Sequence, residues 1–251
     1  MTRVILHGCS GKMGSFITDV FGQDPDLEIV AGVDAFIRND RPYPEYEHLD
    51  DCTEEADVLV DFSNAAAVDG VIGYCLAKKL PMVICTTGLS EEQSAKLAEA
   101  SKSVAVLRSA NMSLGVNVLL KLVAEAARVL ADAGFDIEIL EKHHNQKVDA
   151  PSGTALALAD AVNEAMENRF SYMYDRTQIR RKREKNEIGI QAVRGGTIVG
   201  DHDVIFAGTD EVVEFSHRAY SRAIFAKGAA SAAKFLAGRA PGFYSMADVI
   251  G

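Results

Sequence analysis

The sequence lacks the long apolar segments that mark membrane and secreted proteins. No part of its 251 residues comes near the run of roughly 18 apolar residues that a membrane span needs. The N-terminal MTRVILHGCSG reaches a glycine cluster after only four apolar residues, which is too short for a signal peptide. Both absences predict a cytoplasmic protein with no membrane partner.

Cysteine is also scarce, and its spacing excludes the common uses. The four cysteines form no CxxC pair and no cluster with histidine at metal-ligand spacing, so we expect free thiols and no metal site. They are Cys9, Cys52, Cys75 and Cys85. Cys9 precedes an expected helix, whose N-terminus can lower a thiol pKa, but a small residue fitted into a tight turn is the simpler interpretation.

Positive charge is in short supply as well. The formal net charge is −10, which argues against a nucleic acid or an anionic membrane as partner, because both need a positive surface. The one basic run, RRKREK at 180–185, is expected to form an exposed loop or helix face. A share of 48% hydrophobic residues is typical of a soluble globular protein.

Short apolar segments alternate with helical patterns in the first half of the chain. Buried parallel strands are continuous apolar runs, and their alternation with helices predicts an α/β fold with a doubly wound parallel sheet. The expected strands are 4–6, 27–33, 58–61, 82–85 and 104–107, and the expected helices are 12–21, 64–79 and 90–100.

The pattern changes after residue 107. The expected elements are a helix over 114–131, a strand over 135–140, a helix over 154–166, and strands over 188–193, 197–206 and 211–217. Glycine turns at 194–196 and 207–210 favour hairpins between the last three strands, which predicts a mixed, more antiparallel α+β unit. A final helix over 221–236 resembles the helices of the first half in composition.

A strand, a glycine turn and a helix follow one another at the N-terminus. Gly8, Gly11 and Gly14 have GxxGxxG spacing, and Asp34 ends the next strand 20 residues beyond Gly14. Glycine lets the backbone turn sharply and approach a pyrophosphate, the helix N-terminus receives the negative charge, and the carboxylate binds a ribose hydroxyl. The pattern predicts a dinucleotide site, and a glycine turn without a ligand is the alternative.

Asp34 also bears on the choice of cofactor. A carboxylate at this position repels a 2′-phosphate, whereas an adjacent arginine would bind one. The residues that follow are Ala35 and Phe36, with Arg38 further along the chain. The sequence therefore favours NADH over NADPH.

A second polar cluster follows the strand expected at 135–140. His143, His144 and Lys147 lie within five residues, shortly before a helix that begins near Gly153 and Thr154. Imidazole and ammonium groups can exchange protons, and N–H groups at a helix N-terminus can bind a carboxylate. The alternatives are a hydrogen-bonded loop and a zinc site, although no third zinc ligand follows at suitable spacing.

The stretch EKHHNQKVDAPSGTA at 141–155 resembles the hallmark of the dihydrodipicolinate reductase family, E-x-H-H-x-x-K-x-D-A-P-S-G-T-A. Every fixed position of that pattern is matched. Other segments are similar to the family in the same order, and the resemblance covers essentially the whole chain. They are the glycine loop, TTG at 86–88, SANMSLGVN at 109–117, the stretch from RGG at 194–196 to GDH at 200–202, and SHRAYSR at 216–222.

The resemblance implies an activity and residue roles. The family uses a nicotinamide cofactor to reduce the cyclic product of aspartate semialdehyde and pyruvate, with loss of water from carbon 4, on the diaminopimelate route to lysine. His143 and Lys147 match its proton donors, and His144, Gly153 and Thr154 match positions that bind the dicarboxylate substrate. The positions that match its cofactor-binding segments are Gly8, Cys9, Ser10, Gly11, Lys12, Met13, Asp34, Cys85, Thr86, Thr87, Ser109, Ala110, Asn111 and Met112.

Two positions depart from the family pattern. Cys85 stands where a glycine usually precedes Thr-Thr-Gly, and we expect the backbone contact with the cofactor to survive there. Met112 replaces a usual phenylalanine, and since both are apolar and of similar volume, we expect little loss.

The resemblance also implies a discontinuous architecture. A Rossmann-type dinucleotide-binding domain is expected from residues 1–112 and 219–251. A substrate-binding and oligomerisation domain with an open mixed sheet is expected from 113–218 and would form a homotetramer. One rival is a dehydrogenase of another amino-acid intermediate, which would lack the HHxxK and DAPSGT arrangement. The other is a non-enzymatic NADH-sensing protein, which would not need the proton donors.

Overall fold

The computed structural model describes residues 1–251, which divide into two compact units. The first unit comprises Met1–Leu114 and Arg222–Gly251, and the second comprises Gly115–Ser221. These limits lie two or three residues from the domain boundaries that the family resemblance implied. No helix has the length and apolar character to cross a membrane.

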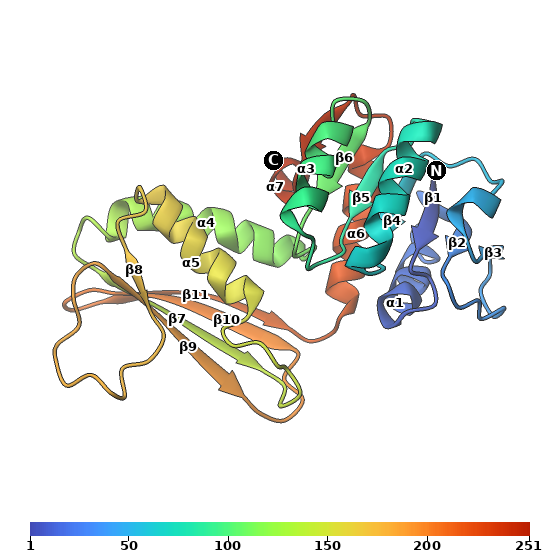
Figure 1. Ribbon diagram of the computed structural model, residues 1–251. Helices are drawn as coiled ribbons and strands as arrows, with labels where there is room; N and C mark the ends of the chain where they lie inside the picture. The colour runs from blue at the N-terminus through green and yellow to red at the C-terminus, as the bar shows by residue number, and fades with distance from the viewer. The chain divides into compact units, whose positions relative to one another are not determined.

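The first unit is built on a seven-stranded parallel sheet in the order β12-β6-β5-β4-β1-β2-β3 (Figure 1). Its strands are β1 (Thr2–His7), β2 (Leu27–Val33), β3 (Glu45–Tyr46), β4 (Val58–Asp61), β5 (Met82–Ile84), β6 (Ala105–Arg108) and β12 (Gly242–Tyr244). The strand order reverses between β1 and β4, and ligands of such sheets bind at the carboxyl ends of the strands beside that point. The predicted doubly wound sheet is confirmed.

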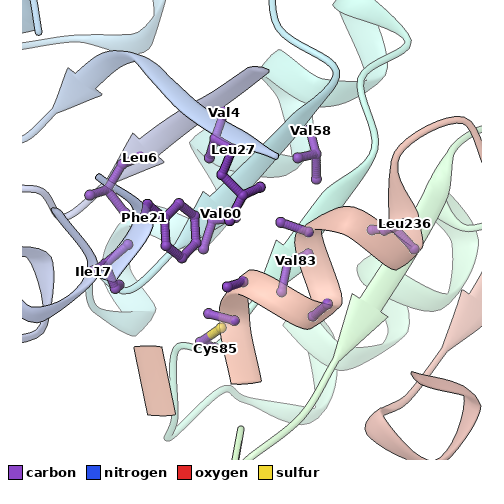
Figure 2. Close-up of a cluster of buried hydrophobic side chains, with 14 of the residues drawn as sticks. Val4, Leu6, Ile17, Phe21, Leu27, Val58, Val60, Val83, Cys85 and Leu236 are labelled. Atoms are coloured by element: carbon purple, nitrogen blue, oxygen red, sulfur yellow. The ribbon is translucent and has the colours of Figure 1, made fainter. Parts of the chain in front are cut away.

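Helices cover both faces of this sheet. Successive side chains of a strand point to opposite faces, so the apolar residues of each buried strand pack under helices on both sides. Val4 and Leu6 belong to the apolar cluster of Figure 2, with α1 and α6, whereas Ile5 between them packs with α2 and α3. The helical segments are α1 (Lys12–Phe21), η1 (Leu49–Asp51), η2 (Ala65–Ala67), α2 (Val68–Lys78), α3 (Glu91–Ala100), α6 (Ala223–Leu236) and α7 (Met246–Ile250). Although α6 follows the second unit in the chain, it packs with α1 in the first.

The cysteines are all buried thiols. Cys85 lies in the apolar cluster of Figure 2, and burial raises the pKa of its thiol well above the usual value. Burial also raises the pKa of Cys9 to about 11. The Cys9 sulfur packs so closely on Gly32 that a Cβ there would lie 2.8 Å from it. The interpretation of Cys9 as a small residue in a tight turn is confirmed.

The second unit has a five-stranded mixed sheet in the order β11-β10-β7-β9-β8. Its elements are α4 (Leu114–Leu130), β7 (Asp136–His143), α5 (Gly153–Ala165), β8 (Ser171–Met173), β9 (Glu187–Arg194), β10 (Gly200–Ala207) and β11 (Val212–Ala219). Both α4 and α5 pack on one face of this sheet, where a single apolar cluster joins them to β7, β9 and β10 (Figure 1). The predicted mixed α+β unit is confirmed.

One predicted hairpin is wrong. β9 and β10 are joined by the glycine turn at 194–196 but do not pair, because β7 lies between them, parallel to β9 and antiparallel to β10. The turn therefore crosses over the end of β7 and does not close a two-stranded ladder. The hairpin of β10 and β11 is confirmed.

β7 runs three residues beyond its predicted end at residue 140. Glu141 is paired with His202 of β10, and His143 is paired with Arg194 of β9. Partner strands on both sides thus keep this polar segment extended. His143 is consequently the last residue of a strand, and not part of the following loop as predicted.

The basic run lies in a loop over residues 174–186 that contains no helix or strand, and most of it is exposed, as expected. Arg183 is the exception. Its guanidinium donates hydrogen bonds to the carbonyl oxygens of Ile137 and Glu187, at 3.1 and 2.9 Å. This arginine therefore fastens the loop to the sheet.

Candidate active site

The predicted cofactor-binding residues all follow the carboxyl ends of strands in the first unit. The glycine loop at 8–13 follows β1, Asp34 follows β2, residues 85–87 follow β5, and residues 109–112 follow β6. Because these strands are parallel, their carboxyl ends lie along the same edge of the sheet. The structure therefore gathers these segments at one edge.

The three glycines of the loop have different surroundings. Gly8 has a φ of +84°, and a Cβ there would lie 2.7 Å from the carbonyl oxygen of Phe62. A Cβ on Gly14 would lie 2.2 Å from the carbonyl oxygen of Cys9. A Cβ on Gly11 would meet only the Gly8 carbonyl oxygen, at 3.4 Å. The fold therefore requires glycine at positions 8 and 14 but leaves room for a methyl group at position 11.

A cavity of about 620 Å³ adjoins the loop, lined by the end of β1, the glycine loop and the segments after β2 and β4. Asp34 stands on its wall, where its carboxylate accepts hydrogen bonds from the N–H groups of Ser10 and Phe36, both at 3.1 Å. Arg41 donates to the Cys9 carbonyl oxygen at 2.7 Å. A loop with two glycines, a helix N-terminus and an anchored carboxylate fit a dinucleotide.

Asp61, which the sequence did not single out, organises the polar groups at the end of β4. Its fully buried carboxylate accepts hydrogen bonds from the hydroxyls of Ser63 and Thr86, at 2.6 and 2.7 Å, and lies 2.7 Å from Nδ1 of His7. An acidic residue at the carboxyl end of a buried apolar strand was the available signal. Thr86, a predicted cofactor contact, is thereby held in place.

Cys85 and Met112, the two departures from the family pattern, both turn inward. Both side chains belong to one buried apolar cluster, in which Figure 2 labels Cys85, and both are nearly inaccessible to solvent. The backbone N–H of Cys85 still donates to the carbonyl oxygen of Asp61, at 3.0 Å. The cysteine thus leaves the course of the backbone after β5 intact.

In the second unit, the apolar face of the sheet becomes polar at one end. The side chains that pack under α4 and α5 come from alternate positions of β7, β9 and β10. The same alternation places Glu141 and His143 of β7, Arg194 of β9 and His202 of β10 on that face. The strand pairing brings all four to the same end of the sheet.

Glu141 is the hub of this polar cluster. Its fully buried carboxylate accepts two hydrogen bonds from Arg194, at 2.7 and 2.8 Å, and one from the N–H of Ser152, at 3.0 Å. It also lies 2.6 Å from Nδ1 of His143. Burial alone raises the pKa of this carboxyl, but the hydrogen bonds from Arg194 and His143 outweigh it and leave the pKa below its usual value. Glu141 is therefore ionised at neutral pH.

His202 lies beside this hub as a neutral ring. Burial, and then the proximity of His143, lowers its pKa to about 4. Its Nε2 lies 3.1 Å from the Ser152 hydroxyl, and its ring meets that of His143 edge-on, with centroids 5.1 Å apart.

This buried histidine should make the protein sensitive to acid. The pKa of His202 is about 4 in the folded protein and about 6.5 in the unfolded chain, so between these values the unfolded chain binds the extra proton. The contribution of His202 to the free energy of unfolding should fall by up to roughly 1.4 kcal/mol per pH unit from about pH 6.5 down to about pH 4. Urea unfolding of the native sequence and of His202→Gln across this range measures that contribution.

His202→Gln should flatten the decline in this window, whereas His48→Gln, which replaces an exposed histidine, should leave it unchanged. An equally steep decline in His202→Gln would show that another group is responsible.

His144 and Lys147 lie in the turn that follows β7. The Lys147 ammonium donates to the Asp149 carboxylate at 2.8 Å, and Arg194 donates to the Asp149 carbonyl oxygen at 2.6 Å. Hydrogen bonds therefore connect Lys147 to His143 through Asp149, Arg194 and Glu141. The two predicted proton donors belong to one network.

α5 begins at Gly153, one residue earlier than predicted, with Ser152 as its N-cap. The Ser152 hydroxyl accepts a hydrogen bond from the N–H of Ala155 at 3.2 Å. Gly153 and Thr154 thus occupy the first turn, where the helix dipole favours an anion.

Proteins of known function resemble the chain over its whole length. The family model for the N-terminus of dihydrodipicolinate reductase matches residues 2–112, and the model for its C-terminus matches residues 115–250. The chain belongs to the dihydrodipicolinate reductase family. The resemblance stated from the sequence is thus confirmed.

Named relatives agree with this assignment. The 4-hydroxy-tetrahydrodipicolinate reductase of Caldanaerobacter subterraneus subsp. tengcongensis is 53% identical, over 100% of this chain and 98% of that protein. The enzyme of the same name from Clostridium tetani is 48% identical, over 98% of this chain and 96% of that protein. Agreement at this level decides against the rival dehydrogenase of another amino-acid intermediate and against a non-enzymatic protein.

A solved structure shares the fold. The dipicolinate-bound dihydrodipicolinate reductase from Paenisporosarcina sp. TG-14 has a TM-score of 0.82 and 24% identity, over 98% of this chain and 97% of that one. The N-terminal part of dihydrodipicolinate reductases is a nucleotide-binding Rossmann domain, which is consistent with the glycine loop and cavity of the first unit and with NAD(P)H.

Proposed function

We infer that this chain is an oxidoreductase that uses NAD(P)H to reduce 4-hydroxy-tetrahydrodipicolinate to tetrahydrodipicolinate with loss of water, on the diaminopimelate route to lysine. Full-length relatives of that name support the reaction. The observation in the structure that carries it is the network that joins His143 and Lys147 beside the N-terminus of α5. This network combines proton donors with a site for an anion.

The first unit is proposed to bind the cofactor, which supplies a hydride when bound. The loop at 8–13 receives the pyrophosphate at the N-terminus of α1, and Asp34 accepts hydrogen bonds from the adenosine ribose. Residues 85–87 and 109–112 contact the nicotinamide half. Their common place at the carboxyl edge of the sheet supports this assignment.

The second unit is proposed to bind the substrate and to supply protons. His143 and Lys147 carry protons at a ring nitrogen and at Nζ, and they protonate the atoms on which negative charge develops. His144, Gly153 and Thr154 bind the substrate carboxylates. The relative that was solved with dipicolinate, a dicarboxylate, supports an anionic substrate of this shape. We further propose a cytoplasmic homotetramer, which light scattering can test.

The anchored Asp34 carboxylate supports a preference for NADH. No arginine side chain is hydrogen-bonded to Asp34, and Arg41 is engaged by the backbone of the glycine loop. We expect a higher kcat/KM with NADH than with NADPH, measured side by side from the loss of reduced-nicotinamide absorbance. The substrate is generated from aspartate semialdehyde and pyruvate by the preceding enzyme. Asp34→Ala should shift the ratio towards NADPH by about tenfold, the equivalent of ~1.4 kcal/mol of lost repulsion.

Leaving out pyruvate is the control, because it removes the cyclic substrate but keeps the cofactor and both enzymes. If neither cofactor is oxidised in the complete mixture, the proposed function is wrong. Oxidation with a preference for NADPH would overturn only the account of Asp34.

A further inference from the structure

We propose that Glu141 is a positioning residue that keeps a proton on Nδ1 of His143, and that Arg194 holds Glu141 in place for this task. The proposal rests on the proposed function, because it concerns the proton donor of the same site.

The hydrogen bonds at Glu141 leave little freedom in how the site is protonated. Arg194 and the backbone N–H of Ser152 can only donate, and together they direct three N–H groups at the two carboxylate oxygens. A buried, ionised carboxylate with an arginine in bidentate contact is rigid and well defined in orientation. The His143 ring nitrogen 2.6 Å from it meets a pure acceptor, so Nδ1 is the protonated nitrogen.

This arrangement leaves Nε2 of His143 to work on the substrate. Nε2 makes no hydrogen bond within the protein, and it is not buried from solvent. A Cβ on Gly200 would lie 2.9 Å from it, so glycine on β10 keeps that side of the ring clear. The second proton of the imidazolium is therefore carried on Nε2, and the Glu141 carboxylate stabilises the charged ring.

Glu141 also joins this donor to the rest of the site. Through Arg194 it connects to the Asp149 carbonyl oxygen and so to Lys147. Through the N–H of Ser152 it connects to the N-terminus of α5. One buried carboxylate thus orients the ring, the loop that carries the second donor, and the helix end proposed to bind a carboxylate.

Glu141→Gln tests this arrangement with almost no change in volume. Ser152 and Nη2 of Arg194 both donate to Oε1, so the amide oxygen takes that position. The NH₂ group then stands at Oε2, where it faces Nδ1 of His143 and loses the hydrogen bond from Nη1 of Arg194. That NH₂ group forces Nδ1 to become the acceptor and moves the proton to Nε2. We expect kcat to fall by about 10²-fold, with the dissociation constant for NADH and the KM for the substrate each within about threefold of the native values.

The tautomer can be read directly by NMR of ¹⁵N-histidine-labelled protein without any substrate. In the native protein, the neutral ring of His143 should carry its proton on Nδ1. In Glu141→Gln it should carry the proton on Nε2. His143→Gln, which deletes the signal, identifies the resonance.

Glu138→Gln is the matched control. Glu138 lies on the same strand and is also paired with an arginine, Arg183, but it points to the opposite face of the sheet. It should keep native kcat and the native His143 tautomer.

An Nε2–H tautomer of His143 in the native protein would overturn the proposal, and this test does not depend on the folding of any variant. In Glu141→Gln, an unchanged tautomer or a kcat within threefold of the native value would also overturn it. Failure of the proposed function can be told apart from failure of this proposal. The native enzyme would then not turn over the substrate, but His143 would still carry its proton on Nδ1.

Arg194→Lys tests whether Arg194 acts through its two hydrogen bonds to Glu141 or only through its positive charge. Arg194→Lys keeps a positive charge but loses the two parallel hydrogen bonds, so kcat should drop by about tenfold with the Nδ1–H tautomer retained. Loss of the tautomer in this variant would assign the fixing of the ring to Arg194 and contradict the role given to Glu141.

Discussion

Replacement of Lys147 by alanine is expected to lower kcat by about 10³-fold while the dissociation constant for NADH stays within about twofold. The ammonium is one of the two proposed proton donors and lies in the second unit, whereas the cofactor segments lie in the first. Removal of the side chain frees Asp149 but leaves the contacts of Glu141 with Arg194 and His143 intact. Steady-state kinetics and NADH fluorescence titration measure the two quantities.

Lys147→Arg decides what the ammonium does. Arginine keeps the positive charge but does not release its proton near neutral pH. If Lys147 donates a proton, Lys147→Arg should recover the KM of the native enzyme and stay low in kcat. If the charge only binds a substrate carboxylate, both parameters should recover, which would contradict the proposed role. Lys185→Ala, in the exposed loop of the same unit, should behave like the native enzyme.

The first unit could be predicted because its signals are local. Its long strands are continuous apolar runs that supply both faces of the sheet at once, and α1 begins and ends where predicted. β3, β8 and β12 were missed, because these short segments are only partly buried and lack the continuous apolar run that revealed β5. Each of them exists only as an addition to the edge of a longer strand.

The candidate site was predictable only in part, because a motif lists neighbours in sequence and not partners in space. Glu141 and His143 could be placed from the family pattern. Arg194, 53 residues from Glu141, becomes its partner only through the pairing of β7 with β9. The misplaced hairpin hid this pairing, since it set β9 beside β10 and left no position for β7 between them.

Gly14→Ala and Gly11→Ala are expected to have different effects, the first on stability and the second on NADH binding. A Cβ at position 14 would lie 2.2 Å from a backbone carbonyl oxygen, so α1 must move away from the glycine loop. Overpacking of this severity should cost about 3 kcal/mol and lower the Tm by roughly 6–12 °C. At position 11 the backbone has φ −70° and ψ 172°, which alanine adopts readily, and the nearest atom would be 3.4 Å away.

Gly11→Ala should therefore keep a Tm within about 2 °C of the native value, because a modest loss at the N-cap is offset by the lower entropy of the unfolded chain. Its methyl group would instead project into the space where the loop is proposed to meet the pyrophosphate, and NADH should bind about tenfold more weakly, a loss of ~1.4 kcal/mol. Calorimetry of the free protein and titration with NADH give both numbers for each variant. Native NADH affinity in Gly11→Ala would mean that the pyrophosphate does not lie against this glycine, whereas an unchanged Tm in Gly14→Ala would mean that α1 can shift freely. The two substitutions add the same methyl group three residues apart, so only the surroundings of each glycine can produce opposite outcomes.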